Sequence, residues 1–246
     1  MWKFKRVMAH RFHTDNLLGL GEIILHQDET NHVLVSRIRP GEKIILFNGD
    51  GNDYYGFFKG LFRREAHFNI EKITTNIREK PFPIVIGAPL PKGDREQFMI
   101  EKLVELGVSV FVPLKTDRSN IHPEPKRLDR LRKHVIEASK QCGRSQLMKI
   151  NNLSSWQKFL STKKDQEKGW IAHGPNRDGL LNQTINLNNE STLGAVGPEG
   201  GLTDKEIEQA KFMGWNVIDL GTLTLRIETA ALLLAWEMGR HAQKII

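Results

Sequence analysis

Residues 193–231 of this chain read LGAVGPEGGLTDKEIEQAKFMGWNVIDLGTLTLRIETAA, and this stretch indicates the class of fold. An apolar run over residues 193–196 ends in Gly-Pro-Glu-Gly-Gly, and Thr203 with Glu206 forms the T-x-x-E pattern of a capping box at a helix start. A second apolar run over residues 215–220 ends at Gly221, and the apolar segment from Thr229 predicts a buried helix. The stretch therefore predicts an α/β arrangement in which two strands end in glycine loops.

These two glycine loops predict a ligand site. Ligands of open α/β sheets bind outside the carboxyl ends of the strands, where glycines let the backbone approach the ligand. The chain contains neither G-x-G-x-x-G nor G-x-x-x-x-G-K-[ST], so we expect a ligand that is not held mainly by its phosphates. The alternative, for one such loop alone, is that Gly-Pro and Gly-Gly only form a turn and bind no ligand. The Arg226-x-Glu228-Thr229 run after the second loop favours the ligand site.

The motifs at residues 197–201 (GPEGG) and 220–230 (LGTLTLRIETA) together resemble the signature of SPOUT-class methyltransferases. The resemblance is to the bacterial 16S rRNA (uracil-N(3))-methyltransferase family. Residues 102–107 resemble its K-x-x-E-L-G motif, residues 137–144 resemble its E-x-x-x-Q-x-x-R motif, and Arg11-Phe12 fits its usual start. The resemblance covers nearly the whole chain, and the two C-terminal motifs together are its most specific part.

The resemblance implies S-adenosylmethionine as the cofactor, bound among three loops at residues 172–174, 197–201 and 220–225. It also implies a trefoil knot in the chain and a homodimer with the cofactor site near the interface. Thr222, Leu223 and Thr224 fill a loop where the family often has Pro-Arg, so the loop shape departs from the family pattern. The residues expected to bind the cofactor are His173, Gly174, Gly197, Pro198, Glu199, Gly200, Gly201, Leu220, Gly221, Leu225, Thr229 and Ala230.

The single cysteine bears on the chemistry. Cys142 falls on the apolar stripe of a predicted helix, so we expect it to pack in the core. Methylation of pyrimidine C-5 normally uses a thiolate, whereas N-3 needs none once its proton is lost. We expect Arg226 to stabilise the uridine anion or orient the base, Glu228 to hold Arg226, and Thr229 to cap the last helix. The proton acceptor stays open between Glu199 and Glu228.

Composition indicates a cytoplasmic enzyme with an anionic partner. The 246 residues carry a net charge of +7, and lysines and arginines contribute most of non-specific affinity for nucleic acid. One cysteine excludes an intramolecular disulfide framework and a multi-cysteine zinc site. His10 and His13 lack ligand partners, so we expect no metal. We see neither a signal-like N-terminal segment nor a run long enough to span a membrane.

The chain is predicted to have two domains. Residues 1–73 show strands at 22–26, 43–47, 54–59 and 63–73 and one helix at 30–38, which suggest a small barrel; the resemblance implies a PUA-like RNA-binding β-barrel domain. Residues 74–83 are the expected linker. Residues 84–246 alternate strands with helices, as at 84–88, 94–106, 110–114 and 125–142, and this predicts a SPOUT domain with a mainly parallel sheet.

The expected RNA partner is the 16S rRNA of the small ribosomal subunit. Four arginines are predicted to contact it, namely Arg11, Arg118, Arg130 and Arg144. Two alternatives stay open. One is a SPOUT methyltransferase that acts on tRNA or on another rRNA position, which nucleoside analysis of the product would separate. The other is an RNA-binding module without enzyme activity, which the glycine loops and Arg226 disfavour.

Overall fold

The computed structural model of this protein describes residues 10–26, 30, 33–76, 79–80, 82–120, 123–174 and 192–241. Contacts between residues divide the chain into two compact units. The first unit comprises Met1–Glu79 and Ser139–Leu147, and the second comprises Lys80–Ala138 and Met148–Ile246. The first unit is therefore discontinuous in sequence, because it includes a short segment from the later part of the chain. The domain boundaries that we expected at residues 73 and 83 stay predictions.

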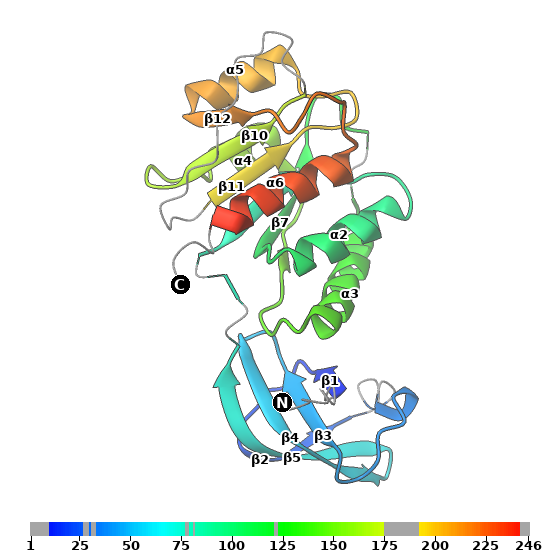
Figure 1. The fold of residues 1–246 in the computed structure, drawn as a ribbon. Coiled ribbons are helices and arrows are strands. Elements are labelled where there is room, and N and C mark those ends of the chain that lie inside the picture. Colours follow the sequence, from blue (N-terminus) through cyan, green and yellow to red (C-terminus); the bar gives the residue numbers. More distant parts are fainter. Residues whose placement is uncertain are drawn as a thin grey trace, which may run out of the picture. The chain divides into compact units, whose positions relative to one another are not determined.

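The first unit is built on a five-stranded mixed sheet (Figure 1). Its strands are β1 (His10–His13), β2 (Gly21–Leu25), β3 (Lys43–Phe47), β4 (Asn52–Phe62) and β5 (Glu65–Thr75). They lie in the order β1-β3-β4-β5-β2; β1 and β3 are parallel, and the other pairs are antiparallel. The strand-rich N-terminal domain is confirmed. Among the described residues, no pairing joins β1 to β2 to close a barrel.

The hairpin between β4 and β5 corrects one expected boundary. We predicted a strand from residue 63, but Arg63 and Arg64 have φ values of 47° and 67°, and the strand begins at Glu65. Two consecutive positive φ angles are typical of the tight turn that matches the twist of a hairpin. The helix expected at 30–38 is seen at Thr30 and at residues 33–35, and residues 31–32 lie outside the described residues.

The second unit contains a parallel sheet, which confirms the predicted α/β class. Its strands are β6 (Ile84–Ala88), β7 (Val110–Lys115), β8 (Lys149–Ile150), β9 (Ser154–Ser155), β10 (Lys168–Ala172), β11 (Thr192–Val196) and β12 (Trp215–Ile218). The order is β12-β10-β11-β6-β7-β8, and β9 also pairs with β7. The described pairs in this sheet are parallel, so the carboxyl ends of neighbouring strands meet at one edge.

Helices cover both faces of this sheet. They are α2 (Arg95–Glu105), α3 (Pro125–Cys142), α4 (Trp156–Leu160), α5 (Asp204–Phe212) and α6 (Ile227–His241). Helix α6 packs on β6, β11 and α2, whereas α4 and α5 contact each other and pack on β7 and β12 respectively (Figure 1). Strand β11 shows why both faces are buried. Its Leu193 and Ala195 join the cluster of α4 and α5, and Gly194 lies against Leu234 and Met238 of α6.

The predicted capping box places the start of α5. The Thr203 side chain accepts a hydrogen bond from the Glu206 backbone N–H, and the Glu206 carboxylate accepts one from the Thr203 N–H at 2.8 Å. This reciprocal pair satisfies two amides at the helix start, so it fixes where the preceding glycine loop ends. The trefoil knot implied by the resemblance stays a prediction.

Candidate functional site

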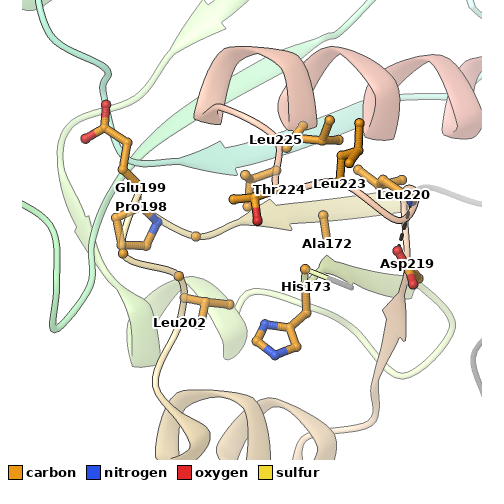
Figure 2. Close-up of a pocket in the computed structure, with 17 residues that line it drawn as sticks. Ala172, His173, Pro198, Glu199, Leu202, Asp219, Leu220, Leu223, Thr224 and Leu225 are labelled. Carbon is orange, nitrogen blue, oxygen red and sulfur yellow. Dashed lines mark hydrogen bonds between the residues drawn. The ribbon is translucent and has the colours of Figure 1, made fainter. Parts of the chain in front are cut away.

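A cavity of about 350 Å³ lies at the carboxyl ends of β10, β11 and β12 (Figure 2). Three loops line it, at residues 172–174, 197–202 and 219–225, together with Val196 and Ala230. These three strands are neighbours in the sheet, so loops that are far apart in sequence converge at the same edge. The sequence predicts a site among the same three loops.

The predicted cofactor-binding residues gather at this cavity. All of them except Thr229 line it. Thr229 is exposed and lies within α6, which begins at Ile227, so the expectation that Thr229 caps this helix was wrong. The cavity thus brings the residues together, and their role as cofactor ligands stays a prediction.

Asp219 lines the cavity and was missed from the sequence. We expected a strand through residue 220, but β12 ends at Ile218, so Asp219 and Leu220 belong to the loop. The Asp219 carboxylate accepts a hydrogen bond from the Gly221 N–H at 2.9 Å. Gly221 has a φ of 136°, a conformation that only glycine adopts without strain. An aspartate two residues before a glycine is the signal that could have predicted this turn.

Apolar side chains form opposite walls of the cavity. In Figure 2, Leu220, Leu223 and Leu225 lie on one side, and Leu202 and His173 lie on the other. His173, Glu199, Asp219 and Thr224 supply the polar side chains. This is the composition expected of a small-molecule site, in which apolar walls bury a ligand and a few polar groups orient it.

His173 is the one imidazole on the cavity wall among the described residues. Burial lowers the pKa of His173 below its ordinary value, an effect that the Lys211 charge strengthens and that the carboxylates of Asp204 and Asp219 oppose. The ring is therefore neutral near pH 7 and presents one donor and one acceptor. The backbone N–H of His173 donates to the Ile218 carbonyl at 3.2 Å, which fixes the loop to the neighbouring strand.

Arg118 braces the GPEGG loop. Its guanidinium Nη1 donates to the Gly200 carbonyl at 2.7 Å. Within the loop, the Gly201 N–H donates to the Pro198 carbonyl at 2.8 Å. Arg118 was predicted as an RNA contact. In the structure, its guanidinium binds the Gly200 carbonyl in the loop that lines the cavity.

Arg95 was not singled out from the sequence, yet it joins two of the predicted site residues. It lies at the start of α2, where its Nη2 is 3.1 Å from Glu199 Oε1 and its Nη1 is 3.8 Å from Glu228 Oε1. The Glu228 residue is only 6% exposed, and its Oε2 has no hydrogen-bond partner among the described residues. Arg95 therefore links the GPEGG loop to the first turn of α6.

Arg226 is exposed just before α6, and its backbone carbonyl accepts a hydrogen bond from the Ala230 N–H at 2.9 Å. We expected Glu228 to hold the Arg226 side chain. The structure instead places the Glu228 carboxylate next to Arg95, at 3.8 Å from its Nη1. Arg226 does not line the cavity in this structure.

The other predicted RNA-contacting arginines also form ion pairs. In the second unit, Arg130 and Arg127 both contact the buried Glu96, each at 2.6 Å. In the first unit, Arg11 pairs with Asp53 at 3.0 Å. Also in the first unit, Arg144 pairs with Glu79 at 3.0 Å, and its side chain is 6% exposed. Arg118 and Arg130 are exposed, with 63% of the Arg130 side chain open to solvent, whereas the side chains of Arg11 and Arg144 are 11% and 6% exposed. RNA contact by these arginines stays a prediction.

Within the described ranges, the structure holds no cluster of three or more side chains suited to a metal ion. The helices of the same ranges include none with the length and apolar character needed to cross a membrane.

Comparison with known proteins agrees with this geometry. The profile of the RNA methyltransferase domain matches residues 78–238. The ribosomal RNA small subunit methyltransferase E of Mesomycoplasma hyopneumoniae is 30% identical over 213 residues, which cover 83% of this chain and 88% of that protein.

Two solved structures are similar in fold and contain a bound cofactor. A ribosomal RNA small subunit methyltransferase E from Neisseria gonorrhoeae, bound to S-adenosylmethionine, has a TM-score of 0.83 and 29% identity, covering 94% of this chain and 97% of that one. A methyltransferase from Legionella pneumophila in complex with S-adenosylmethionine has a TM-score of 0.81 and 25% identity, covering 96% and 98%.

The domain match covers more than half of the chain and includes all three loops of the cavity. The Mesomycoplasma relative extends the match over most of both proteins. The resemblance inferred from the glycine loops is confirmed, and this chain belongs to the RNA methyltransferase family of the ribosomal RNA small subunit methyltransferases E.

Proposed function

We propose that this protein transfers a methyl group from S-adenosylmethionine to N-3 of a specific uridine in the 16S rRNA of the small ribosomal subunit. The observation that carries this proposal is the cavity at residues 172–174, 197–202 and 219–225, in a chain of this family. Similar proteins with bound S-adenosylmethionine support the choice of cofactor.

The residues of the cavity fit this cofactor. Its adenine ring is flat and apolar on both faces, which suits the leucine walls and the neutral His173. Its sulfur is cationic, and the carboxylates of Glu199 and Asp219 lie on the cavity wall. At Gly197, an added Cβ would approach Leu202 Cγ to 2.9 Å, so the loop backbone is already as close to that wall as packing allows. The glycine loops would hold the cofactor through backbone groups.

When bound, S-adenosylmethionine supplies a methyl group on a positively charged sulfur, which accepts the electron pair of the broken carbon–sulfur bond. The protein has three tasks in this reaction. The apolar walls exclude water, the loops orient the two reactants, and charged groups favour the uracil anion whose N-3 lone pair forms the new bond. Arg226 carries the third task, because its exposed guanidinium can approach a base that enters from solvent.

Glu228 is the better candidate for the acceptor of the N-3 proton. Its Oε2 has an unused hydrogen-bonding capacity in a buried position, whereas Glu199 is half exposed and bound to Arg95 at 3.1 Å. Arg95 acts as a positioning residue here, because its guanidinium contacts both carboxylates, at 3.1 Å from Glu199 and 3.8 Å from Glu228. The proton would thus pass from N-3 to a carboxylate that the fold holds at the start of α6.

The wider assignments rest on the family. Arg130 is the predicted RNA contact that best fits a phosphate, since its side chain is 63% exposed. Arg11, Arg118 and Arg144 support RNA binding indirectly, by holding the segments around them. A homodimer, a trefoil knot and a cytoplasmic location complete the proposal.

The test uses labelled S-adenosylmethionine with two acceptors, small ribosomal subunits from cells that lack the corresponding enzyme and unmodified tRNA. Label should enter the subunits and not the tRNA. The Gly221→Val variant should lose cofactor binding in calorimetry, because valine is strained at a φ of 136°. The matched control is Gly19→Val, at a glycine with open space around it. Labelling of tRNA alone would refute the rRNA assignment, and unchanged cofactor binding by Gly221→Val would refute the site.

A further inference from the structure

The outer face of the first unit's sheet carries a hollow of about 600 Å³ that none of the predicted site residues lines. Its wall includes two aromatic side chains, Tyr55 and Phe57, and two lysines, Lys43 and Lys72. The strands that supply them, β3, β4 and β5, lie side by side in the sheet (Figure 1). We call this hollow the aromatic groove.

The strand register pairs each aromatic with a lysine. Tyr55 and Phe57 are two residues apart on β4, so they point to the same face, with a spacing of roughly 7 Å. Lys43 of β3 lies opposite Phe57, and Lys72 of β5 lies opposite Tyr55. The residues that flank the two aromatics, Tyr54 and Phe58, turn inward to the core. The outer face thus repeats the same pair of side chains along the strand.

A bulge shapes the groove between the two aromatics. The register of β4 against β5 shifts between Tyr55 and Gly56. A Cβ added at Gly56 would approach the Asn69 carbonyl oxygen to 2.0 Å, so the two backbones touch where only glycine fits. Glu71 also lines the groove near this bulge, and it is the only acidic side chain among the lining residues described.

A hydrogen bond of its hydroxyl group holds the Tyr55 ring in place. Its hydroxyl donates to Asp53 Oδ2 at 3.2 Å, and Arg11 Nη1 donates to the other carboxylate oxygen at 3.0 Å. Ser145 and Asn76 also donate to Asp53, whose residue is 7% exposed. Burial, followed by the Asp53 charge, raises the pKa of Tyr55, so the phenol keeps its proton and this hydrogen bond near neutral pH.

The faces of these rings are available to a ligand. Tyr55 is 38% exposed, and Phe57 is half-buried. Among the described residues, neither Tyr55 nor Phe57 stacks on another ring or lies under a cation. If Lys43 and Lys72 served only to stabilise these rings by cation–π contacts, their amines would lie over the ring faces. The groove therefore presents flat apolar surfaces with amines beside them.

We propose that the aromatic groove binds an unpaired segment of RNA, with bases against Tyr55 and Phe57 and phosphates near Lys43 and Lys72. Single-stranded nucleic acid is recognised by such a combination, since every base has a flat face and every nucleotide carries a negative charge. A duplex conceals its base faces and does not fit. This inference deepens the proposed function and rests on it, because it assigns the substrate RNA to a second surface outside the methyl-transfer cavity.

The groove also gives Arg11 a different role from the predicted one. Its guanidinium donates hydrogen bonds to Asp53, Ser145 and the Arg144 carbonyl, at 3.0, 2.8 and 3.0 Å. Arg11 is therefore a positioning residue, which holds the carboxylate that fixes Tyr55. Its replacement should affect RNA binding through the ring.

The experiment measures the affinity of the full-length protein for a fluorescent single-stranded RNA of about 12 nucleotides, and for the same sequence as a duplex, by anisotropy at several salt concentrations. Tyr55→Leu should weaken binding of the single strand about tenfold and leave the salt dependence and the duplex affinity unchanged. Lys43→Gln with Lys72→Gln should reduce the slope of log affinity against log salt by about 1.4.

Two substitutions outside the groove serve as matched controls. Phe212→Leu replaces an aromatic that is 93% exposed on α5, and Lys158→Gln removes an exposed lysine from α4; both should bind RNA like the wild type. Wild-type affinity for the single strand in Tyr55→Leu would overturn the groove, as would an equal loss for the duplex. Cofactor affinity is measured in parallel. Failure of methyl transfer with normal cofactor binding would contradict the proposed function, and the anisotropy data would still decide the groove.

Discussion

Gly197→Ala tests whether the GPEGG loop is held at the distance that cofactor binding needs. The added Cβ would lie 2.9 Å from Leu202 Cγ and 3.0 Å from the Leu202 backbone N, whereas carbon atoms in contact are about 3.5–4.0 Å apart. Leu202 is 4% exposed and cannot move into solvent. Overpacking of this kind costs about 1–3 kcal/mol, partly offset by the lower entropy of the unfolded alanine chain, about 0.4–1 kcal/mol.

We expect the loop to relieve this overlap by moving away from Leu202, into the cavity. We therefore expect a loss of about 1–2 kcal/mol in unfolding free energy, which is about 2–8 °C in Tm, and about tenfold weaker binding of S-adenosylmethionine. Thermal denaturation and isothermal titration calorimetry measure the two effects.

Gly200→Ala is the matched control in the same loop. Its Cβ would lie 3.4 Å from Arg118 Cδ, an ordinary contact with a flexible side chain, so stability should change by less than about 0.5 kcal/mol. Cofactor affinity that is unchanged in Gly197→Ala, or a stability loss in Gly200→Ala as large as that of Gly197→Ala, would show that the contact with Leu202 does not set the position of this loop.

Three further changes test other parts of the structure. Arg95→Gln should lower kcat for rRNA methylation more than cofactor affinity, since it leaves the buried Glu228 without its cation, and Arg95→Lys should restore part of the rate; equal rates for all three proteins would count against the positioning role. Arg144→Ala should cost about 3 kcal/mol in urea unfolding because the ion pair with Glu79 is buried, whereas Arg130→Ala should cost less than about 1 kcal/mol. The opposite ranking would exclude a structural role for Arg144. Burial lowers the pKa of His173, so protonation is less favourable in the folded protein than in the unfolded chain. Stability from this group is complete above the unfolded value near 6.5 and is lost as the pH falls through the folded pKa; His173→Gln should flatten the acid side of the Tm–pH curve, and an unchanged curve would exclude this contribution.

Local sequence patterns predicted the elements around the cavity. The T-x-x-E pattern at Thr203 and Glu206 and the glycines at 197–201 and Gly221 depend on a few neighbouring residues, so they are readable from the sequence. The alternation of apolar strands and helices likewise predicted a parallel sheet, which the pairing of β6, β7, β10, β11 and β12 confirms.

Contacts between distant residues could not be predicted in this way. Arg95 lies more than a hundred residues from Glu199, and its sequence context shows only a helix start. Arg144 looked like a free cation in a motif, but its partner, Glu79, lies in a segment that we assigned to a linker. Side-chain direction at a helix start is equally non-local, since it sent Glu228 to Arg95 and away from Arg226.

Mass spectrometry of nucleosides from small ribosomal subunits, after incubation with this protein and labelled S-adenosylmethionine, identifies the atom that is methylated. The subunits come from cells that lack the corresponding enzyme. We expect labelled 3-methyluridine with the wild type and a sharp fall with Arg226→Ala, whose cofactor affinity should be unchanged. Label in a different nucleoside, or full activity of Arg226→Ala, would contradict this expectation.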